Sequence, residues 1–277
     1  MDILAKPEFA GRRVVVVHHD DLGVSHAANV AHRALTRFPS GSIMMTTAWA
    51  AEWAGDTDHD LGVHLTLTSE WKSPRYRPIT CGPSLRDSRG YLWPTVEEAW
   101  AKIVAAEAEA EMCAQIEAAL ALDIDVTHID AHMGVVLRPD LAEIYHRLAR
   151  EYRILAFLPD PVALGHMQLP ATVAATLQSM TRASSLPKFR PVDGYSGPPN
   201  TRADWLSDML SALEPGLYHF IHHAAITTPE SQAFPDWETR QADFDALQAR
   251  GVNAVLDKCV LTTYRELRDM LRDAGEL

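Results

Sequence analysis

Residues 14–25, VVVVHHDDLGVS, contain the run that decides the fold. Four consecutive valines before a turn signal are typical of a short buried strand, because β-branched side chains favour extended backbone. Asp20 and Asp21 stand where this strand ends. Two adjacent carboxylates at a buried strand end repel each other, and burying them is costly unless a cation or a shared proton compensates. The pair therefore indicates a chemical site, or else Asp21 caps the helix expected from Ser25.

The composition is that of an ordinary globular protein: 277 residues, 47% hydrophobic and 22% charged, with a formal net charge of −12. This acidic balance argues against nucleic acid or an anionic membrane as the main partner, since both require a basic surface. We find neither an apolar run near the roughly 20 residues that span a bilayer nor a signal-peptide core. The three cysteines, Cys81, Cys113 and Cys259, are widely spaced and fit reduced thiols. We therefore expect a cytoplasmic protein.

Strand-like and helix-like segments alternate along the chain. We expect one domain over residues 1–277, with irregular insertions near 69–94 and 161–200. The first expected strand begins at residue 14. The other expected strands cover 42–49, 61–68, 125–132, 153–158, 216–223 and 259–264. Expected helices cover 25–38, 95–121, 141–152, 171–181, 205–213, 237–248 and 265–274. This alternation predicts an α/β fold with parallel strands, and about seven strands favour a TIM-like (β/α) barrel over an open sheet. In such barrels the chemistry lies at the carboxyl ends of the strands.

Histidines and aspartates gather at four of these strand ends: Asp20 and Asp21; His64; His128, Asp130 and His132; His222 and His223. Two imidazoles and a carboxylate suit a divalent ion such as Zn²⁺, with Mn²⁺, Co²⁺ or Ni²⁺ also suitable. Each group has a structural alternative. His64 fits a buried structural histidine, the H-x-D-x-H spacing fits a hydrogen-bonded pair, and His222-His223 fits an exposed loop. Their coincidence at one face of the expected barrel favours a metal site.

Four segments resemble a known family. HDDLGVS (19–25), LGVHLTLT (61–68), THIDAH (127–132) and TTYREL (262–267) are similar to the ADDFGLS, GLHLTLT, THIDSH and SYREL motifs of the YdjC-like carbohydrate deacetylases, which are related to polysaccharide deacetylases. The likeness runs from about Val14 to Leu267. It implies a (β/α) barrel, a divalent metal and a hydrolase that removes N-acetyl groups from amino sugars or their oligosaccharides.

The resemblance also implies roles for individual residues. Asp21, His64 and His132 would bind the metal, and Asp20 would be the general base. His128 and Asp130 would support the ligands, because a ligating imidazole needs a partner on its other nitrogen. The expected cofactor is a divalent ion, Zn²⁺ or Mg²⁺ first and Mn²⁺, Co²⁺ or Ni²⁺ otherwise.

The chain departs from the family pattern at several positions, one of which concerns the general acid. The late family histidine aligns with His222, which would be the general acid, but the following proline is His223 here, so the choice between the two stays open. The family usually has Asn or Ala before the aspartates, where this chain has His18 and His19. An arginine commonly ends the strand near 157, where this chain has Phe157. Loss of that arginine indicates a different substrate or weaker activity.

Other interpretations remain open. A metal-dependent hydrolase of phosphoesters or other amides fits the same barrel, although more lysine and arginine would be expected near the strand ends. A catalytically degenerate metal- or sugar-binding relative also fits. Trp71, Trp93 and Trp205 would either line a saccharide cleft or pack loops onto the barrel. The proline-rich segments 72–94 and 182–200 would form lids or a homodimer surface.

Overall fold

A parallel sheet forms the centre of the molecule. The computed structural model describes residues 3–277. Its strands are β1 (Arg13–Leu22), β2 (Ser40–Ile43), β3 (Asp60–Leu65), β4 (His128–Ala131), β5 (Leu155–Ala156), β6 (Arg190–Asp193), β7 (Gly216–His222) and β8 (Val260–Leu261). Every pairing between them is parallel. The predicted α/β fold with a parallel sheet is confirmed.

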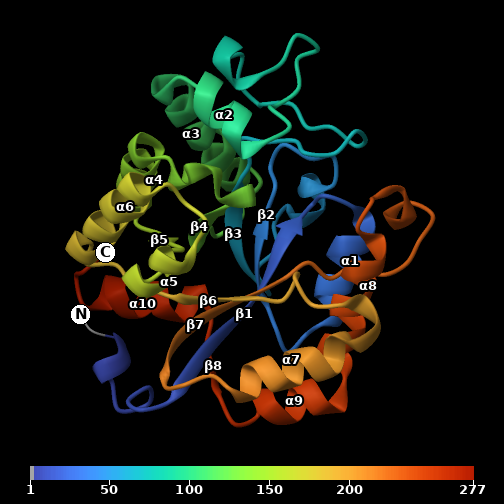
Figure 1. Ribbon diagram of the computed structural model, residues 1–277, viewed down its shortest axis with the longest axis vertical. Helices are drawn as coiled ribbons and strands as arrows, with labels where there is room; N and C mark the ends of the chain where they lie inside the picture. Colours follow the sequence, from blue (N-terminus) through green and yellow to red (C-terminus); the bar gives the residue numbers. More distant parts are fainter. Residues whose placement is uncertain (1–2) are drawn as a thin grey trace.

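The sheet curls into a half-barrel that stays open (Figure 1). The strand order is β5-β4-β3-β2-β1-β7-β6, and β8 pairs with the first half of β1. Within residues 3–277, an isolated bridge between Pro159 and Phe189 links the segments beside the two edge strands. A closed TIM-like barrel is therefore not confirmed. The edges are weak pairing partners, since β5 has two residues and β6 contains Pro191, which lacks an amide donor.

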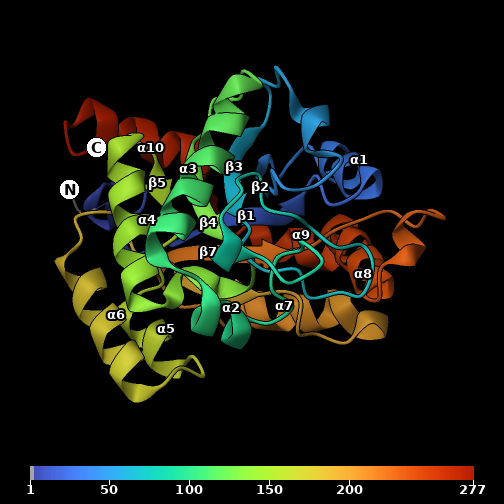
Figure 2. The same cartoon turned by 90° about the horizontal axis from the view of Figure 1, so that it is seen from above.

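Helices cover the outside of this half-barrel (Figures 1 and 2). They are α1 (His26–Ala34), α2 (Val96–Lys102), α3 (Ala105–Ala121), α4 (Pro139–Glu151), α5 (Pro161–His166), α6 (Ala171–Ala183), α7 (Arg202–Ser211), α8 (Trp237–Gln248), α9 (Arg250–Leu256) and α10 (Tyr264–Asp273). A short 3-10 turn, η4 (His132–Leu137), follows β4 directly. In the described part of the chain, no helix combines the length and apolarity needed to cross a membrane.

The long helix expected over 95–121 is divided in two. Ile103 and Val104 adopt extended backbone between α2 and α3. The Val104 amide donates to Oγ of Ser84, at 2.9 Å, and Ser84 also donates to Glu107 of α3. Ser84 belongs to the 69–94 insertion, so a contact distant in sequence interrupts a pattern that is locally helical.

The structure also contains elements that the sequence pattern missed. Residues 161–200 hold the short helix α5 and the edge strand β6, and α9 follows α8 after a break at Ala249. The sequence RPVD of β6 has one buried residue, Val192, so it shows no apolar alternation.

Candidate functional site

Strand β1 sorts its residues between two faces of the sheet. Side chains alternate along a strand, so the even-numbered residues from 14 to 20 face the interior and the odd-numbered ones from 15 to 19 face the helices. His18 and Asp20 therefore point inward. His19 points outward, where its Nδ1 lies 3.2 Å from Nδ1 of His32 in α1.

Asp21 reaches the inner side because β1 carries a bulge. Alternation alone would aim Asp20 and Asp21 in opposite directions. Between His19 and Leu22, three steps along β1 match two steps along β2, so β1 has one extra residue there. Asp21 adopts φ of 63°, a left-handed conformation that aspartate tolerates better than most residues. Both carboxylates consequently line the same cavity.

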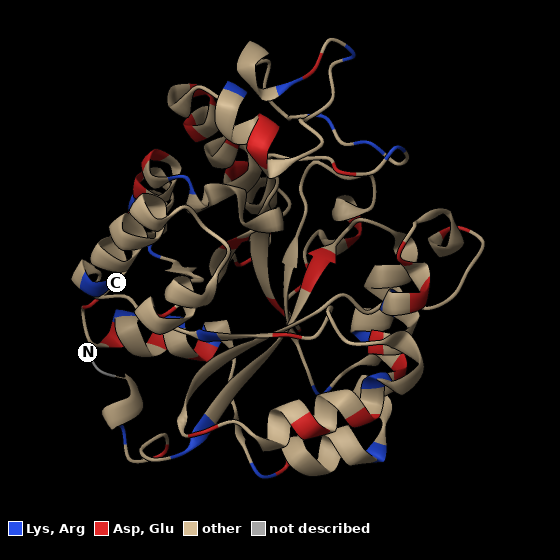
Figure 3. Cartoon of the chain, in the orientation of Figure 1, with Lys and Arg blue, Asp and Glu red and all other residues tan. Residues whose placement is uncertain are grey.

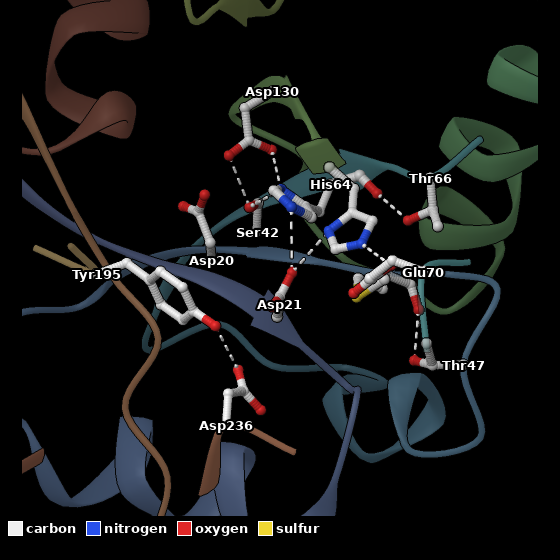
Figure 4. A network of polar contacts seen from close by, with 12 residues as sticks. Asp20, Asp21, Ser42, Thr47, His64, Thr66, Glu70, Asp130, Tyr195 and Asp236 are labelled. Atoms are coloured by element: carbon white, nitrogen blue, oxygen red, sulfur yellow. Dashed lines mark hydrogen bonds and ion pairs between the residues drawn. The ribbon is translucent and has the colours of Figure 1, made fainter. Parts of the chain in front are cut away.

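The helix-cap interpretation of Asp21 is wrong. The cap of α1 is Ser25, whose Oγ accepts from the amide of Ala28 at 3.0 Å. The Asp21 carboxylate instead contacts two imidazoles: its Oδ1 lies 3.3 Å from Nε2 of His64 and 3.1 Å from Nδ1 of His132. Figure 4 shows His64 and Asp21 facing each other.

The three residues form a compact group, here called the triad: Asp21, His64 and His132. They come from the ends of β1 and β3 and from the residue after β4. One ligand atom from each lies within 4.8 Å of the others, and all three side chains are buried. The residues that the family resemblance assigned to a metal are thus brought together, in a geometry that could hold one ion.

Asp130 fixes the orientation of His64. Its Oδ1 lies 2.8 Å from Nδ1 of His64, and its Oδ2 accepts from Oγ of Ser42 at 2.9 Å (Figure 4). The other ring nitrogen of His64 is thereby left facing Asp21. A carboxylate that holds the far nitrogen of an imidazole is the usual support of a metal ligand.

Asp20 has a separate support beneath the triad. Nδ1 of His18 lies 2.7 Å from Oδ1 of Asp20, and Nε2 of His18 lies 2.8 Å from Nε2 of His128. Space for the His128 ring comes from Gly62 on β3, where a Cβ would lie 2.5 Å from that ring. His18, which the family motif leaves unexplained, therefore positions the predicted base.

The structure separates His222 from His223. Strand β7 pairs with β1 so that Ile221 stands beside His18 and His222 beside His19. His222 consequently faces the helices, with its ring 4.4 Å from that of His19, and it is not among the described residues that line the cavity. His223 does line it. The site thus receives the histidine after the one that the motif alignment selected.

Four functional candidates escaped the sequence analysis: Glu70, Tyr195, Asp236 and Arg240. Oε2 of Glu70 lies 3.0 Å from Nε2 of His132. Arg240, on α8, donates to Asp21 Oδ2 and to Asp236 Oδ2, both at 2.8 Å. Tyr195 donates to Asp236 at 3.3 Å (Figure 4). Glu70 stands two residues after LGVHLTLT, whereas the other three lie in loops and on a helix far from the motifs. No local pattern marks any of the four.

Charge compensation explains how the buried carboxylates are tolerated. Burial raises the pKa of Asp21, but the nearby His132 and Arg240 outweigh it and hold that pKa well below its usual range. Burial lowers the pKa of His132, yet Glu70 and Asp21 raise it to about 9. In Figure 3, acidic residues mark the end of β1 near the middle of the molecule. Arg240 and His132 therefore supply the compensation that burial of Asp21 requires.

The strand ends open into one cavity of about 470 Å³. It is lined by the predicted residues Asp20, Asp21, His64, Asp130, His132 and His223, together with Glu70, Trp71, Tyr195, Asp236 and Arg240. Of the three tryptophans considered, Trp71 lines the cavity. Trp93 donates to the Ser84 carbonyl, and Trp205 packs over Gly197, so these two hold loops in place.

Comparison with known proteins places this arrangement in a family. Residues 14–258 match the family model described as YdjC-like protein. The chain belongs to the YdjC-like family. The matched range contains every member of the triad, and the family resemblance inferred from the motifs is confirmed.

Individual YdjC-like relatives agree with this assignment. A carbohydrate deacetylase of Thermus thermophilus is 46% identical over 271 residues, covering 98% of this chain and all of the relative. A carbohydrate deacetylase of Geobacillus stearothermophilus is 30% identical over 151 residues, covering 51% of this chain and 58% of the relative. A crystal structure from Enterococcus faecalis V583, named for cellobiose-phosphate cleavage, superposes with a TM-score of 0.71 at 20% identity over 92% of this chain and 99% of that one. At that identity the likeness shows the fold.

Proposed function

We propose that this YdjC-like protein is a single-domain, metal-dependent hydrolase that removes N-acetyl groups from amino sugars or their oligosaccharides. The observation that carries the proposal is the buried triad of Asp21, His64 and His132 at the wall of a cavity. The name of the 46% identical relative, carbohydrate deacetylase, supports the reaction class.

The residues of the triad fit a divalent ion. Two imidazoles and one carboxylate are a donor set that Zn²⁺ takes in catalytic sites, which leaves room for water and substrate. The histidine pKa values provide a second argument, since those of both His64 and His132 are raised by neighbouring carboxylates. Those carboxylates attract positive charge, and an ion would replace the protons on the ring nitrogens that face Asp21, since a ligating imidazole must be neutral. We propose Zn²⁺ or Mg²⁺, with Mn²⁺, Co²⁺ or Ni²⁺ as alternatives.

A bound ion would act as a Lewis acid on the acetyl carbonyl and make a water molecule more acidic. Asp20 is the proposed general base, and His18 holds its carboxylate in place. Burial raises the pKa of Asp20, but the hydrogen bond from His18 and the charge of His64 bring it below its usual value, so Asp20 is anionic. His223 is the proposed proton donor to the leaving amine, in place of His222, because its side chain lines the cavity. Acid–base groups of this kind contribute about 10²–10⁴-fold to the rate.

The roles can be separated by pairing metal analysis with turnover. We expect Asp20→Asn to keep the ion and lose turnover, whereas His132→Ala loses the ion. Asp140→Asn, at an exposed position on α4, is the matched control. The assay measures acetate released from N-acetylglucosamine and its oligomers with each candidate ion, and elemental analysis measures the ion. Equal loss of the ion in both site variants would contradict the division of roles.

The neighbouring histidines provide a second comparison. We expect a larger loss of kcat in His223→Gln than in His222→Gln, because only the former lines the cavity. The reverse order would return the acid role to His222. Release of phosphate from an organic phosphomonoester, with no acetate from the amino sugar, would favour a phosphoesterase. Tight sugar binding without any hydrolysis would favour a degenerate relative.

A further inference from the structure

The cavity has two chemically different walls. The polar wall comes from the ends of β6 and β7 and from α8. Nη1 of Arg240, Oδ1 of Asp236 and Nδ1 of His223 are buried there without a hydrogen-bond partner among residues 3–277. Burying unpartnered polar atoms is costly, so this wall is suited to a ligand that supplies hydrogen bonds. Tyr195 and Asp236 lie together on this side, beside Asp21 (Figure 4).

The other part of the cavity is apolar, and it lies between η4, the end of β5 and helices α4 to α6. We call this part the apolar chamber, and its aliphatic lining includes Val136, Leu137, Ala142, Leu158, Leu164 and Leu177. None of the unpartnered buried polar atoms in the described part of the chain belongs to its lining. Its Tyr145 hydroxyl is already bonded to the Ile129 carbonyl at 2.8 Å. Burial lowers the pKa of its His146 to about 4, so that imidazole is neutral.

This chamber suits an apolar substituent and not a sugar ring. Apart from His146 and Thr181, the lining offers a sugar hydroxyl no side-chain partner, so most hydroxyls placed there would lose their hydrogen bonds to water. The whole cavity, about 470 Å³, falls within the range of about 300–1,000 Å³ that small-molecule sites occupy. The single methyl of an acetyl group would leave most of an aliphatic lining drawn from three helices uncovered.

Phe157 makes the floor of the cavity apolar as well. Its ring stacks on His219 with centroids 4.2 Å apart, at the position where the family resemblance places an arginine. A guanidinium there would disfavour an apolar chain, because its charge would have to be desolvated. The substitution that indicated a different substrate therefore occurs where the chamber meets the polar residues of the site.

We propose that the preferred substrate is an amino sugar whose amide carries an acyl chain longer than acetyl. The sugar lies on the polar wall and the chain lies in the apolar chamber. This inference rests on the proposed hydrolase function and names its substrate class. Water adds to the amide carbonyl and the C–N bond breaks. The hydroxyl of water stays on the acyl carbon to give a carboxylic acid, and its other hydrogen goes to the amine.

A chain-length series tests the chamber directly. Amine release is measured from N-acetyl-, N-butyryl- and N-hexanoylglucosamine with Zn²⁺. We expect kcat/KM to rise about fourfold for each added methylene that the chamber buries. A kcat/KM that stays constant or falls from acetyl to hexanoyl would overturn the proposal.

Variants link the preference to the chamber. Ala142→Leu adds volume to the lining, and we expect it to lower the hexanoyl-to-acetyl ratio of kcat/KM about tenfold. Ala175→Leu makes the same change on the exposed face of α6 and should leave the ratio unchanged. Leu177→Ala enlarges the chamber and should shift the preference towards longer chains. This variant tests the chamber even if Ala142→Leu does not fold. Wild-type ratios in both chamber variants would contradict the assignment.

Binding measurements separate this inference from the proposed function. Calorimetry with the metal-free protein compares N-hexanoyl- and N-acetylglucosamine without turnover. Cleavage of the acetyl sugar alone, with no tighter binding of the hexanoyl sugar, would contradict the chamber proposal and leave the deacetylase function intact. If neither sugar is cleaved with any ion, the hydrolase function fails. Tighter hexanoyl binding would then still support the chamber, and equal binding would refute it.

Discussion

Nδ1 of His18 lies 2.7 Å from Oδ1 of Asp20, two residues further along the same strand and on the same inner face. The two side chains meet because alternation in β1 continues to Asp20 and breaks only at the bulge that follows. This contact places the predicted base beside the triad but outside it. Nδ1 of His18 lies farther, 3.9 Å, from Oδ2 of Asp130, which supports His64. We therefore expect loss of His18 to act mainly on Asp20, which is testable.

Removing the His18 ring should impair turnover and spare the ion. We expect His18→Leu to lower kcat by about 10–100-fold, because Asp20 loses its positioning partner, while the metal content stays at the wild-type level. His18→Asn places an amide near the position of Nδ1 and should recover part of kcat. The measurements are kcat and KM taken separately, with elemental analysis. Loss of the ion in His18→Leu would show that the two supports are coupled.

Gly62 should not accept a side chain. A Cβ at this position would lie 2.5 Å from the ring of His128, which is itself enclosed by His18 and by the stacked Tyr264. We expect Gly62→Ala to lower the free energy of unfolding by about 1–3 kcal/mol, as overpacked cores do. Gly251→Ala, in the exposed part of α9, is the control and should be neutral or stabilising. Urea denaturation compares them, and equal stability of the two variants would contradict the packing argument.

Arg240 should stabilise the fold most when no ion is bound. Its guanidinium is buried and pairs with Asp21 and Asp236. We expect Arg240→Met to cost about 3–5 kcal/mol of unfolding free energy in chelator, because it removes the guanidinium partner of two buried carboxylates. Added Zn²⁺ should recover part of that loss, since it would neutralise Asp21. A loss of the same size with and without Zn²⁺ would argue against an ion at the triad.

The histidines on the outer face should make the protein sensitive to acid. Burial lowers the pKa of His32 from 6.5 to about 3, so the folded state keeps it neutral. Above pH 6.5 neither state binds the proton and stability is complete. Between pH 6.5 and about 3 the unfolded state alone binds it, which lowers the unfolding free energy by about 1.4 kcal/mol per pH unit. Unfolding followed from pH 7 to 4 should show a shallower slope in His32→Gln, and an unchanged slope would refute the assignment.

Much of the fold was predictable because it follows from local patterns. The valine run and the alternation in LGVHLTLT specify buried strands, and β1, β3 and β7 lie close to where they were expected. The edge strand β6 and the division between α2 and α3 were not predictable. Both depend on partners distant in sequence, such as Ser84 against Val104.

The sequence by itself determined which residue types stand at the ends of the inner strands, and its motifs marked Asp20, Asp21, His64 and His132. Tertiary structure alone decided which side chains meet. The bulge turned Asp21 towards the imidazoles, and the register of β7 on β1 sent His222 outward and left His223 at the cavity. Packing of α8 brought Arg240 to Asp21 across 219 residues. The physical reason is that facing and register depend on pairing between distant segments, and a one-residue shift changes them without altering any local pattern.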